Sequence, residues 1–480
     1  HYGTPLLGGR VFAVVSDGDL MEGVSAEAAS LAGHLGLGNL VYIYDDNHIS
    51  IGGDTSITFS EDIARRFESY GWQVQRVDGH DTTQVTEALE CAIAENARPS
   101  LICARTLIGK GSPHKAGSAE VHGTPLGAEE LEAVRRALGW HEPPFSVPKD
   151  VYDFCAARVV EKKKEYTRWQ ADYQIWRSRN PTEAAALDRQ VSGALPPQLK
   201  CELLERFSKP KKDATRNLSG EVLQVLAKHV PGLIGGSADL EPSNKTLIKG
   251  SADIKAGAYG GRNIRFGVRE HAMGAIANGL AYTRMWVPYT ATFLVFSDYM
   301  RPPIRLAALS HLHTLFIFTH DSFWVGEDGP THQPVEHIWG LRMIPGLYVF
   351  RPADGLETAM CYLAALQKRR PSALLFTRQN LASIAREEGF DAELILRGAY
   401  VVGGAACRDL VLVASGSEVS LALEAARLLA EEKIPARVVS LPCLELFKEQ
   451  PPQYREDVLP AQSRRAVSYT HLTLPTIYSV

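Results

Sequence analysis

Short apolar runs alternate with longer amphipathic segments through the first hundred or so residues of the chain. This pattern predicts strands at residues 11–15, 40–44, 72–77 and 101–105, and helices at 24–35, 61–70 and 83–97. Continuous apolar strands separated by helices are typical of a parallel sheet with helices on both faces. The first part of the chain, residues 1–140, is therefore expected to form an α/β domain.

The alternation of strands and helices is interrupted once, at residues 141–210, and then resumes. Residues 141–210 contain several prolines and one long charged helix at 152–177, which indicates a helical linker. A second α/β domain is expected over 211–390, with strands at 264–267, 315–319 and 373–377 and a helix at 270–282. A third, over 391–467, has strands at 410–414 and 436–441 around a helix at 418–432, too few elements for a complete domain.

Both ends of the chain are unusual for a natural protein. The sequence starts at His1 rather than Met and reaches its first strand within ten residues or so. Residues 468–480 (SYTHLTLPTIYSV) carry no charged side chain and do not continue the alternation of helices and strands before them. Both features favour a non-native tail. We therefore expect a fragment of a longer protein.

Composition narrows the class of protein. The 480 residues are 45% hydrophobic and 22% charged, with a net charge of −4, so neither nucleic acid nor an anionic membrane is expected as a partner. The seven cysteines are scattered without a C-x-x-C pair, as in a reduced cytoplasmic protein. No apolar run is long enough to span a bilayer, and no signal peptide is visible.

Polar residues follow two neighbouring strands of the first domain. Asp17 and Gly18 come directly after the strand at 11–15, and Asn47 follows the strand at 40–44. Taken singly, each group is explained by a turn. Together, at the carboxyl ends of adjacent parallel strands, they can ligate Mg²⁺ and through it hold a diphosphate.

This segment, SDGDLMEGVSAEAASLAGHLGLGNLVYIYDDNHISI, resembles the thiamine diphosphate motif of transketolases. The resemblance implies that Asp17, Asn47 and the backbone carbonyl of Ile49 are the ligands of Mg²⁺ (or of Ca²⁺ or Mn²⁺). It also implies that Gly18 contacts thiamine diphosphate. Ser16 stands where the family has its first glycine, and a small residue is expected to be tolerated there.

A second segment, GVREHAM, places Glu270 at a strand-to-helix junction. By itself a glutamate in the first helical turn indicates only capping. The segment resembles the part of transketolases that supplies the catalytic glutamate, which implies that Glu270 hydrogen-bonds the aminopyrimidine ring of the cofactor in an apolar pocket that raises its pKa. Phe293, Phe296 and Tyr299, at spacings of three along an expected helical face, resemble the aromatic wall of that pocket.

The polar string GEDGPTHQPVE at 326–336 is the most specific in the chain. Its spacing fits no standard zinc signature, and it resembles a signature of transketolases and their nearest relatives. The resemblance implies sugar-phosphate contacts from His122, Arg216, Ser243, His320, Asp328, His332 and Arg378. His122 is also implied to touch the cofactor, and His320 to transfer protons as a catalytic residue.

The resemblance spans nearly the whole chain and implies a transketolase, which transfers a two-carbon ketol group from xylulose 5-phosphate to ribose 5-phosphate in the pentose phosphate pathway. It implies consecutive thiamine diphosphate-binding-type domains, a truncated third domain, and a homodimer with active sites at the interface. A fragment lacking part of the first domain is expected to be inactive alone. Dihydroxyacetone synthase, deoxyxylulose-phosphate synthase and a non-catalytic subunit of the same fold remain alternatives.

Overall fold

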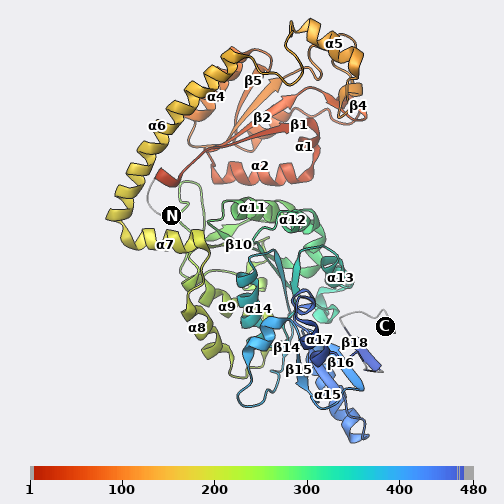
Figure 1. Cartoon of the computed structure of the whole chain (residues 1–480). Helices are drawn as coiled ribbons and strands as arrows, with labels where there is room; N and C mark the ends of the chain where they lie inside the picture. The colour runs from red at the N-terminus through yellow and green to blue at the C-terminus, as the bar shows by residue number, and fades with distance from the viewer. Residues whose placement is uncertain (1–4, 462, 464, 470–480) are drawn as a thin grey trace. The chain divides into compact units, whose positions relative to one another are not determined.

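A computed structural model of the chain describes residues 5–461, 463 and 465–469, which form two compact units. The first comprises His1–Ala185 and Lys255–Tyr259, and the second Ala186–Ile254 and Gly260–Val480. In Figure 1 the first unit runs from red to gold and the second from yellow-green to blue. Among the described residues, no helix is both long and apolar enough to cross a membrane.

The first unit contains a four-stranded sheet in which all neighbouring strands are parallel. In spatial order the strands are β1 (Val11–Ser16), β2 (Leu40–Asp46), β6 (Ser100–Arg105) and β5 (Gln73–Asp78). The helices between them are α1 (Asp17–Met21), α2 (Gly23–Leu35), α3 (Ile63–Ser69) and α4 (Thr82–Ala94). Apart from α1, each of these elements matches a predicted one with small shifts at its ends.

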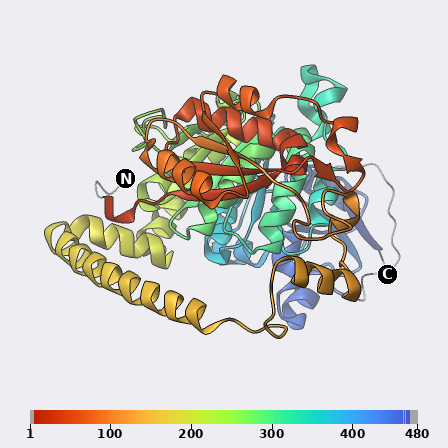
Figure 2. The same ribbon diagram turned by 90° about the horizontal axis from the view of Figure 1, so that it is seen from above.

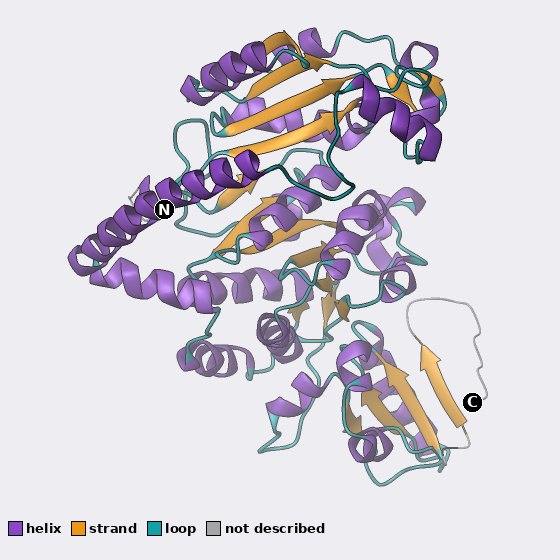
Figure 3. Cartoon of the chain, turned by 45° about the horizontal axis from the view of Figure 1, so that its top comes forward, coloured by secondary structure: helices purple, strands orange, loops and turns teal. Residues whose placement is uncertain are grey.

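Helices cover both faces of this sheet, as Figure 3 shows. Tyr44 of β2 packs in one apolar cluster with Ala29 of α2 and Phe67 of α3. Val41 of the same strand packs in a second cluster with Ala92 of α4. Because residues at odd spacing along a strand point to opposite faces, these clusters lie on the two sides of the sheet. The predicted α/β class is confirmed.

The rest of the first unit is a short hairpin and three helices. The hairpin pairs β3 (Ile49–Ser50) with β4 (Gly53–Asp54), and the helices are α5 (Ala128–Ala137), α6 (Lys149–Arg179) and the first part of α7 (Pro181–Ser192). Figure 2 shows α6 as one long, unbroken helix. The indole N–H of Trp169 in α6 donates to the carbonyl of Leu6 at 2.9 Å, which fixes this helix to the first described turn.

The second unit contains a six-stranded parallel sheet. In spatial order its strands are β12 (Tyr348–Phe350), β13 (Ser372–Phe376), β11 (Leu315–Thr319), β10 (Val287–Phe293), β8 (Leu233–Ser237) and β9 (Asn263–Arg265). Helices α8 (Pro197–Phe207), α9 (Thr215–His229) and α14 (Gly355–Lys368) share one large apolar cluster with these strands. Helices α11 (Glu270–Tyr282) and α12 (Ser297–Leu309) pack against each other, with the side-chain amide of Asn278 donating to the carbonyl of Pro303 at 2.8 Å.

The same unit includes a second, smaller sheet at the end of the chain. Its order is β15 (Tyr400–Gly403), β17 (Arg437–Ser440), β16 (Leu410–Ala414) and β18 (Arg465–Tyr469), with β15 antiparallel to β17. Helices α15 (Glu418–Glu431), α16 (Leu444–Lys448) and α17 (Pro452–Val458) accompany it. Of the predicted tail at 468–480, Ser468 and Tyr469 belong to β18, and 470–480 lie outside the described residues.

The prediction that three aromatic residues share one helical face is wrong. Phe293 is the last residue of β10, Phe296 lies in a 3₁₀ turn (Leu294–Phe296), and Tyr299 lies in α12. The pattern of β10 is hard to recognise because Pro288 and two buried threonines interrupt its apolar run. The rings nevertheless form a row, because the turn places successive aromatic residues side by side.

A buried ionic cluster joins the six-stranded sheet to the smaller one. The Arg351 guanidinium, which has no exposed surface, donates to a carboxylate oxygen of Asp321 at 2.7 Å and to the carbonyl of Ser415 at 2.6 Å. It also donates to the carboxylate of Glu418 in α15. Two acidic partners from different sheets therefore share one cation.

We expect Arg351→Met to destabilise the protein by about 3–5 kcal/mol, since it leaves two buried carboxylates without their cation. The measurement is urea unfolding followed by circular dichroism. As a matched control, Arg427→Met removes an arginine paired with Glu424 and Glu431 on the exposed face of α15, and should cost less than about 1 kcal/mol. Equal effects of the two substitutions would contradict the importance assigned to the buried cluster.

Candidate functional site

The first group of predicted site residues lies at the carboxyl edge of the sheet in the first unit. β1 runs directly into α1, and Asp17 is the first residue of that helix. The register pairs Ser16 of β1 with Asp45 of β2, so the residues that follow each strand emerge side by side. The predicted juxtaposition of Asp17 with the turn after β2 is therefore found.

Asp17 is a buried carboxylate with one oxygen in use. Only 2% of its surface is exposed, and its Oδ1 accepts a hydrogen bond from the hydroxyl of Tyr44 at 2.6 Å. Its Oδ2 is buried without a hydrogen-bond partner. Burial raises the pKa of this carboxyl, although the Tyr44 hydrogen bond opposes the shift. A buried oxygen without a partner is a costly arrangement that a bound cation would relieve.

The side-chain amide of Asn47 is fixed by its neighbours. Its Oδ1 accepts the backbone N–H of Ile49 at 2.9 Å, and its Nδ2 donates to Asp45 at 3.0 Å. The amide oxygen keeps a second lone pair, and the carbonyl group of Ile49 lies two residues further along the chain.

At the other end of the site, Ser16 caps α1 through a reciprocal capping box with Asp19. Serine in place of glycine thus has a local structural role here.

The geometry fits a hard divalent cation and a diphosphate. Carboxylate, amide and carbonyl oxygens are the donors that Mg²⁺ prefers. A Cβ added at Gly18 would meet only the Ser16 hydroxyl, at 3.9 Å, so the backbone there has open space beside it. A cavity of about 500 Å³ adjoins the group and is lined in part by Asp17, Tyr44, Asp46 and His48. His122 lies apart in an exposed loop after Ala119–Val121.

The second group lies at the carboxyl edge of the six-stranded sheet and is centred on His320. This residue follows β11 with a left-handed backbone (φ 60°) and is 3% exposed. A row of buried side chains holds it: Ser237 donates to Asn244 at 2.6 Å, Asn244 donates to Thr319 at 2.7 Å, and the Thr319 hydroxyl lies 2.9 Å from His320 Nδ1. The imidazole is therefore oriented with its Nε2 toward the neighbouring charged residues.

Charged residues from three other segments surround that nitrogen. Arg216 in α9 places an Nη1 atom 3.5 Å from His320 Nε2 and donates to the carbonyl of Ser243 at 3.3 Å. An Asp328 oxygen is 3.9 Å from the same nitrogen and 3.8 Å from Nε of Arg378. Arg216, His320, Asp328 and Arg378 were predicted from the sequence to contact the substrate, and the fold brings their side chains together. The predicted Ser243 joins this group through its backbone carbonyl.

Aromatic rings form one wall of this group. The Phe293 ring centre lies 3.7 Å from that of His320, and Phe296 stacks on Phe293 at 6.0 Å. His332 meets the edge of Phe296 at 5.4 Å. Tyr299 continues the row at 6.1 Å from Phe296 but is 64% exposed. The row thus runs from the buried imidazole to the surface of the unit.

The electrostatics of the group favour a neutral imidazole in a positive environment. Burial, and then the charges of Arg216 and Arg378, lower the pKa of His320 to about 3. Burial and the neighbouring Arg378 also lower the pKa of the Arg216 guanidinium. The two arginines therefore repel each other, and a bound anion would relieve that repulsion.

Glu270 begins α11, as the sequence predicted. β9 ends at Arg265, Gly267 adopts a left-handed φ of 66°, and the helix starts three residues later. The side chain of Glu270 is half-buried. The first unit holds Asp17, Gly18, Asn47, Ile49 and His122, and the second holds Arg216, Ser243, Glu270, Phe293, Phe296, Tyr299, His320, Asp328, His332 and Arg378.

Among the described residues, one cluster of carboxylates and imidazole has metal-like spacing away from these groups. Ligand atoms of Asp298, Glu336 and His337 lie within 4.8 Å of one another. The His337 Nδ1 accepts the backbone N–H of Val335 at 3.3 Å, and its Nε2 lies 3.3 Å from a carboxylate oxygen of Asp298. Local contacts of His337 therefore account for this cluster.

Comparison with known proteins decides the family. Residues 1–196 match the thiamine diphosphate binding domain of transketolase, 211–383 its pyrimidine binding domain, and 398–478 a transketolase-like C-terminal domain. The transketolase of Geobacillus stearothermophilus is 46% identical over 464 residues, covering 95% of this chain and 69% of the relative. The chain belongs to the transketolase family. The predicted family membership and transferase class are confirmed.

Solved transketolase structures share the fold. The enzyme from Leishmania mexicana aligns with a TM-score of 0.93 at 40% identity, over 97% of this chain and 70% of the other. The enzyme from Campylobacter jejuni aligns with a TM-score of 0.89 at 38% identity, over 98% and 72% of the two chains. The transketolase fold therefore extends over nearly all of this chain.

Sequence reasoning missed the residues that position the predicted ones. Tyr44 holds Asp17, while Asn244 and Thr319 hold His320. The signal in the sequence is weak, because Tyr44 and Thr319 are polar residues within strands and Asn244 ends the short helix α10 (Glu241–Asn244). That signal is too common to select these three before their partners are known.

We expect the His320 imidazole to stay neutral throughout pH 8 to 5, because its pKa is lowered to about 3. The measurement is an NMR titration, with the His320 signal assigned by its loss in His320→Gln. Since an unfolded histidine takes up its proton near pH 6.5, the stability that the neutral native form contributes should be lost as pH falls from about 6.5 toward 3. Arg216→Met should raise the pKa of His320, and a wild-type midpoint near 6.5 would contradict the account.

Proposed function

We propose that this transketolase-family chain catalyses transfer of a two-carbon ketol group from a ketose phosphate, such as xylulose 5-phosphate, to an aldose phosphate, such as ribose 5-phosphate, in the pentose phosphate pathway. Family membership supports the transferase class. One observation carries the assignment of substrate: a buried, neutral His320 stands beside Arg216 and Arg378 at the carboxyl edge of the sheet. A sugar phosphate offers both a hydroxyl for the imidazole and an anion for the arginines.

The proposed phosphate clamp uses the planar forks of Arg216 and Arg378, which suit phosphate oxygens in pairs. Asp328, close to His320 and Arg378, can accept hydrogen bonds from sugar hydroxyls. Ser243 and His332 complete the donor set. The net positive charge of this group is a reason for phosphorylated sugars to bind in preference to free ones.

The proposed cofactors are thiamine diphosphate and a divalent cation such as Mg²⁺, Ca²⁺ or Mn²⁺. The buried, unpartnered Oδ2 of Asp17 is the strongest support for the cation, with Asn47 and the Ile49 carbonyl as its further ligands. When bound, thiamine diphosphate supplies the electron sink that carbon–carbon bond cleavage requires. Gly18 leaves room for the diphosphate. In the family resemblance, His122 is the loop residue that touches both cofactor and substrate.

Glu270 and the aromatic row define the proposed ring site. Glu270 would hold a proton against a ring nitrogen of the cofactor, and Phe293, Phe296 and Tyr299 would exclude water from that ring. His320, neutral at physiological pH, can accept a proton at Nε2 from a sugar hydroxyl and return it. Its partner Thr319 keeps the ring in position during that exchange.

We also propose a homodimer in the cytoplasm. Large apolar side chains of the second unit are exposed around α11, α12 and α13 (His337–Arg342), among them Val268, Leu306, Leu309 and Met343. Burial of such side chains against a second copy would remove them from water.

The proposed location in the cytoplasm is supported by the cysteines. All seven cysteines are free of disulfide bonds, which suits a reducing compartment.

We expect Asp17→Asn to weaken Mg²⁺-dependent binding of thiamine diphosphate at least about 100-fold in calorimetric titration, and to abolish ketol transfer in a coupled assay with xylulose 5-phosphate and ribose 5-phosphate. The substitution keeps the shape of the side chain but removes the charge that a cation needs. Glu61→Gln is the matched control, because Glu61 lines the same cavity but pairs with Arg66.

Loss of binding in Asp17→Asn with full binding in Glu61→Gln is the expected pair of results. Unchanged cofactor affinity in Asp17→Asn would refute the cation site. Cofactor binding without any ketol transfer by the wild-type protein would refute the proposed reaction for this chain, and would agree with the inactivity that the sequence predicts for a fragment.

A further inference from the structure

The second unit contains a cavity at the opposite edge of its sheet from His320. It has a volume of about 470 Å³ and is formed where strands begin: Gly232 precedes β8, Val287 starts β10, His313 precedes β11, and Arg369 precedes β13. The residues of the candidate site follow the carboxyl ends of the same strands. The cavity is therefore separated from that site by the length of the sheet.

Positive charge dominates the lining of this cavity. Arg189, Arg284 and Arg369 reach it from three different segments, and His229, His311 and His313 add three imidazoles, of which His229 contacts Glu202 at 2.7 Å. None of the described residues that line it is an aspartate or a glutamate. One guanidinium nitrogen of Arg369 donates to the carbonyl of Ser192 at 2.7 Å, which anchors that side chain at the wall. Such a lining selects for an anion.

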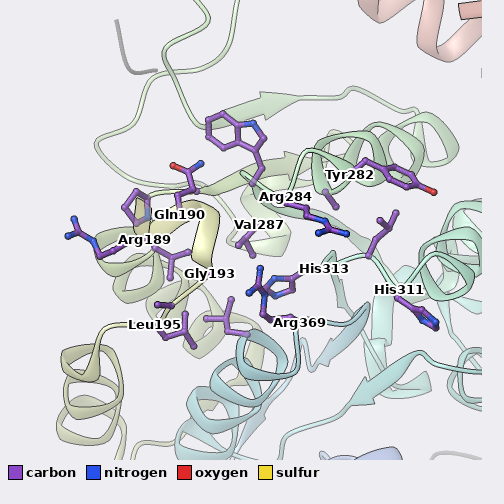
Figure 4. Close-up of a pocket in the computed structure, with 18 of the residues that line it drawn as sticks. Arg189, Gln190, Gly193, Leu195, Tyr282, Arg284, Val287, His311, His313 and Arg369 are labelled. Atoms are coloured by element: carbon purple, nitrogen blue, oxygen red, sulfur yellow. The ribbon is translucent and has the colours of Figure 1, made fainter. Parts of the chain in front are cut away.

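His313 provides a second, independent indication of a ligand. Its Nε2 is buried and has no hydrogen-bond partner. Burial, and then the charge of Arg369, lower its pKa to about 4, so the ring is neutral and its unpaired nitrogen is not relieved by protonation at physiological pH. Figure 4 shows the side chains of His313 and Arg369 beside each other, with the Arg284 guanidinium on the side nearer Tyr282. A phosphate group between them would meet the imidazole and Arg369 on one side and Arg284 on the other.

The remaining lining is suited to a short carbon skeleton. Leu195, Val287 and Leu312 contribute apolar surface, and Gln190 and Ser310 contribute polar groups. The volume is within the range of sites for small organic molecules, about 300–1,000 Å³. An inorganic ion alone would leave most of this space and its apolar surface unused.

We propose that this cavity binds a small organic phosphate, with Arg284, Arg369 and His313 holding the phosphate group and Leu195 and Val287 contacting the carbon skeleton. A phosphate monoester is favoured over a carboxylate because guanidinium groups from two directions can engage its three terminal oxygens at once. The proposal does not depend on the identity of the substrate at the other edge of the sheet.

The test is calorimetric titration of the protein with glycerol 3-phosphate, with inorganic phosphate, glycerol and acetate as separate arms. We expect saturable binding of glycerol 3-phosphate, at least about 10-fold weaker binding of inorganic phosphate, and no binding of glycerol or acetate. Arg284→Gln and the double variant Arg284→Gln/Arg369→Gln should each weaken binding, the latter at least about 10-fold. Arg305→Gln, on the exposed part of α12, is the matched control and should bind like the wild type.

Two further readouts locate the ligand. The NMR signal of the His313 ring should shift saturably with glycerol 3-phosphate, and it should do so in Arg378→Met as well, which removes the proposed substrate clamp. Unfolding temperatures of the variants show whether a loss of binding reflects a loss of folding; Arg284→Gln alone keeps the Arg369 anchor. Binding that disappears in Arg378→Met, or an unshifted His313 signal at saturation, would overturn the proposal, as would equal affinity for acetate.

Discussion

The approach of two arginines to a buried, neutral imidazole is the interaction on which the site of the second unit depends. His320 rests in its neutral form, because burial and the charges of Arg216 and Arg378 disfavour the charged one. An Asp328 oxygen lies 3.8 Å from the Arg378 guanidinium and 3.9 Å from the His320 imidazole. A row of hydrogen bonds from Ser237 through Asn244 to Thr319 holds the imidazole in place beside the two arginines. An anionic substrate would reduce the repulsion between those arginines.

Buried polar groups that lack a partner also occur at other sheet edges. Parallel strands bring polar residues together at both of the edges where strands begin and end, and the packed helices keep water away from them. At Asp17 the result is a carboxylate oxygen without a donor, and at His313 an imidazole nitrogen without a partner. Each unsatisfied atom lies beside a cavity. The anchoring of Arg351 between Asp321 and Glu418 shows the contrasting case, in which buried charges satisfy one another.

Much of this arrangement was accessible from the sequence, because the strands and their ends follow from apolar runs separated by helices. Asp17, Asn47 and Glu270 were located correctly at strand ends or helix starts. The aromatic row was assigned to one helix, because a spacing of three is shared by helices and by the strand-to-turn path that Phe293 begins. The positioning role of Asn244 could not be predicted from its neighbours in the sequence, since it depends on a hydrogen bond to Thr319 in a distant segment.

The central claim is that the positive charges of Arg216 and Arg378 beside His320 select phosphorylated sugars. The most direct measurement compares ketol transfer from xylulose 5-phosphate with transfer from xylulose in wild-type protein and in Arg378→Met. The account predicts that the substitution raises KM for xylulose 5-phosphate at least about 10-fold while the slower reaction with xylulose is nearly unchanged, since only the former loses a charge-assisted contact. An equal rise in KM for xylulose 5-phosphate and for xylulose, or no rise for either, would contradict the account.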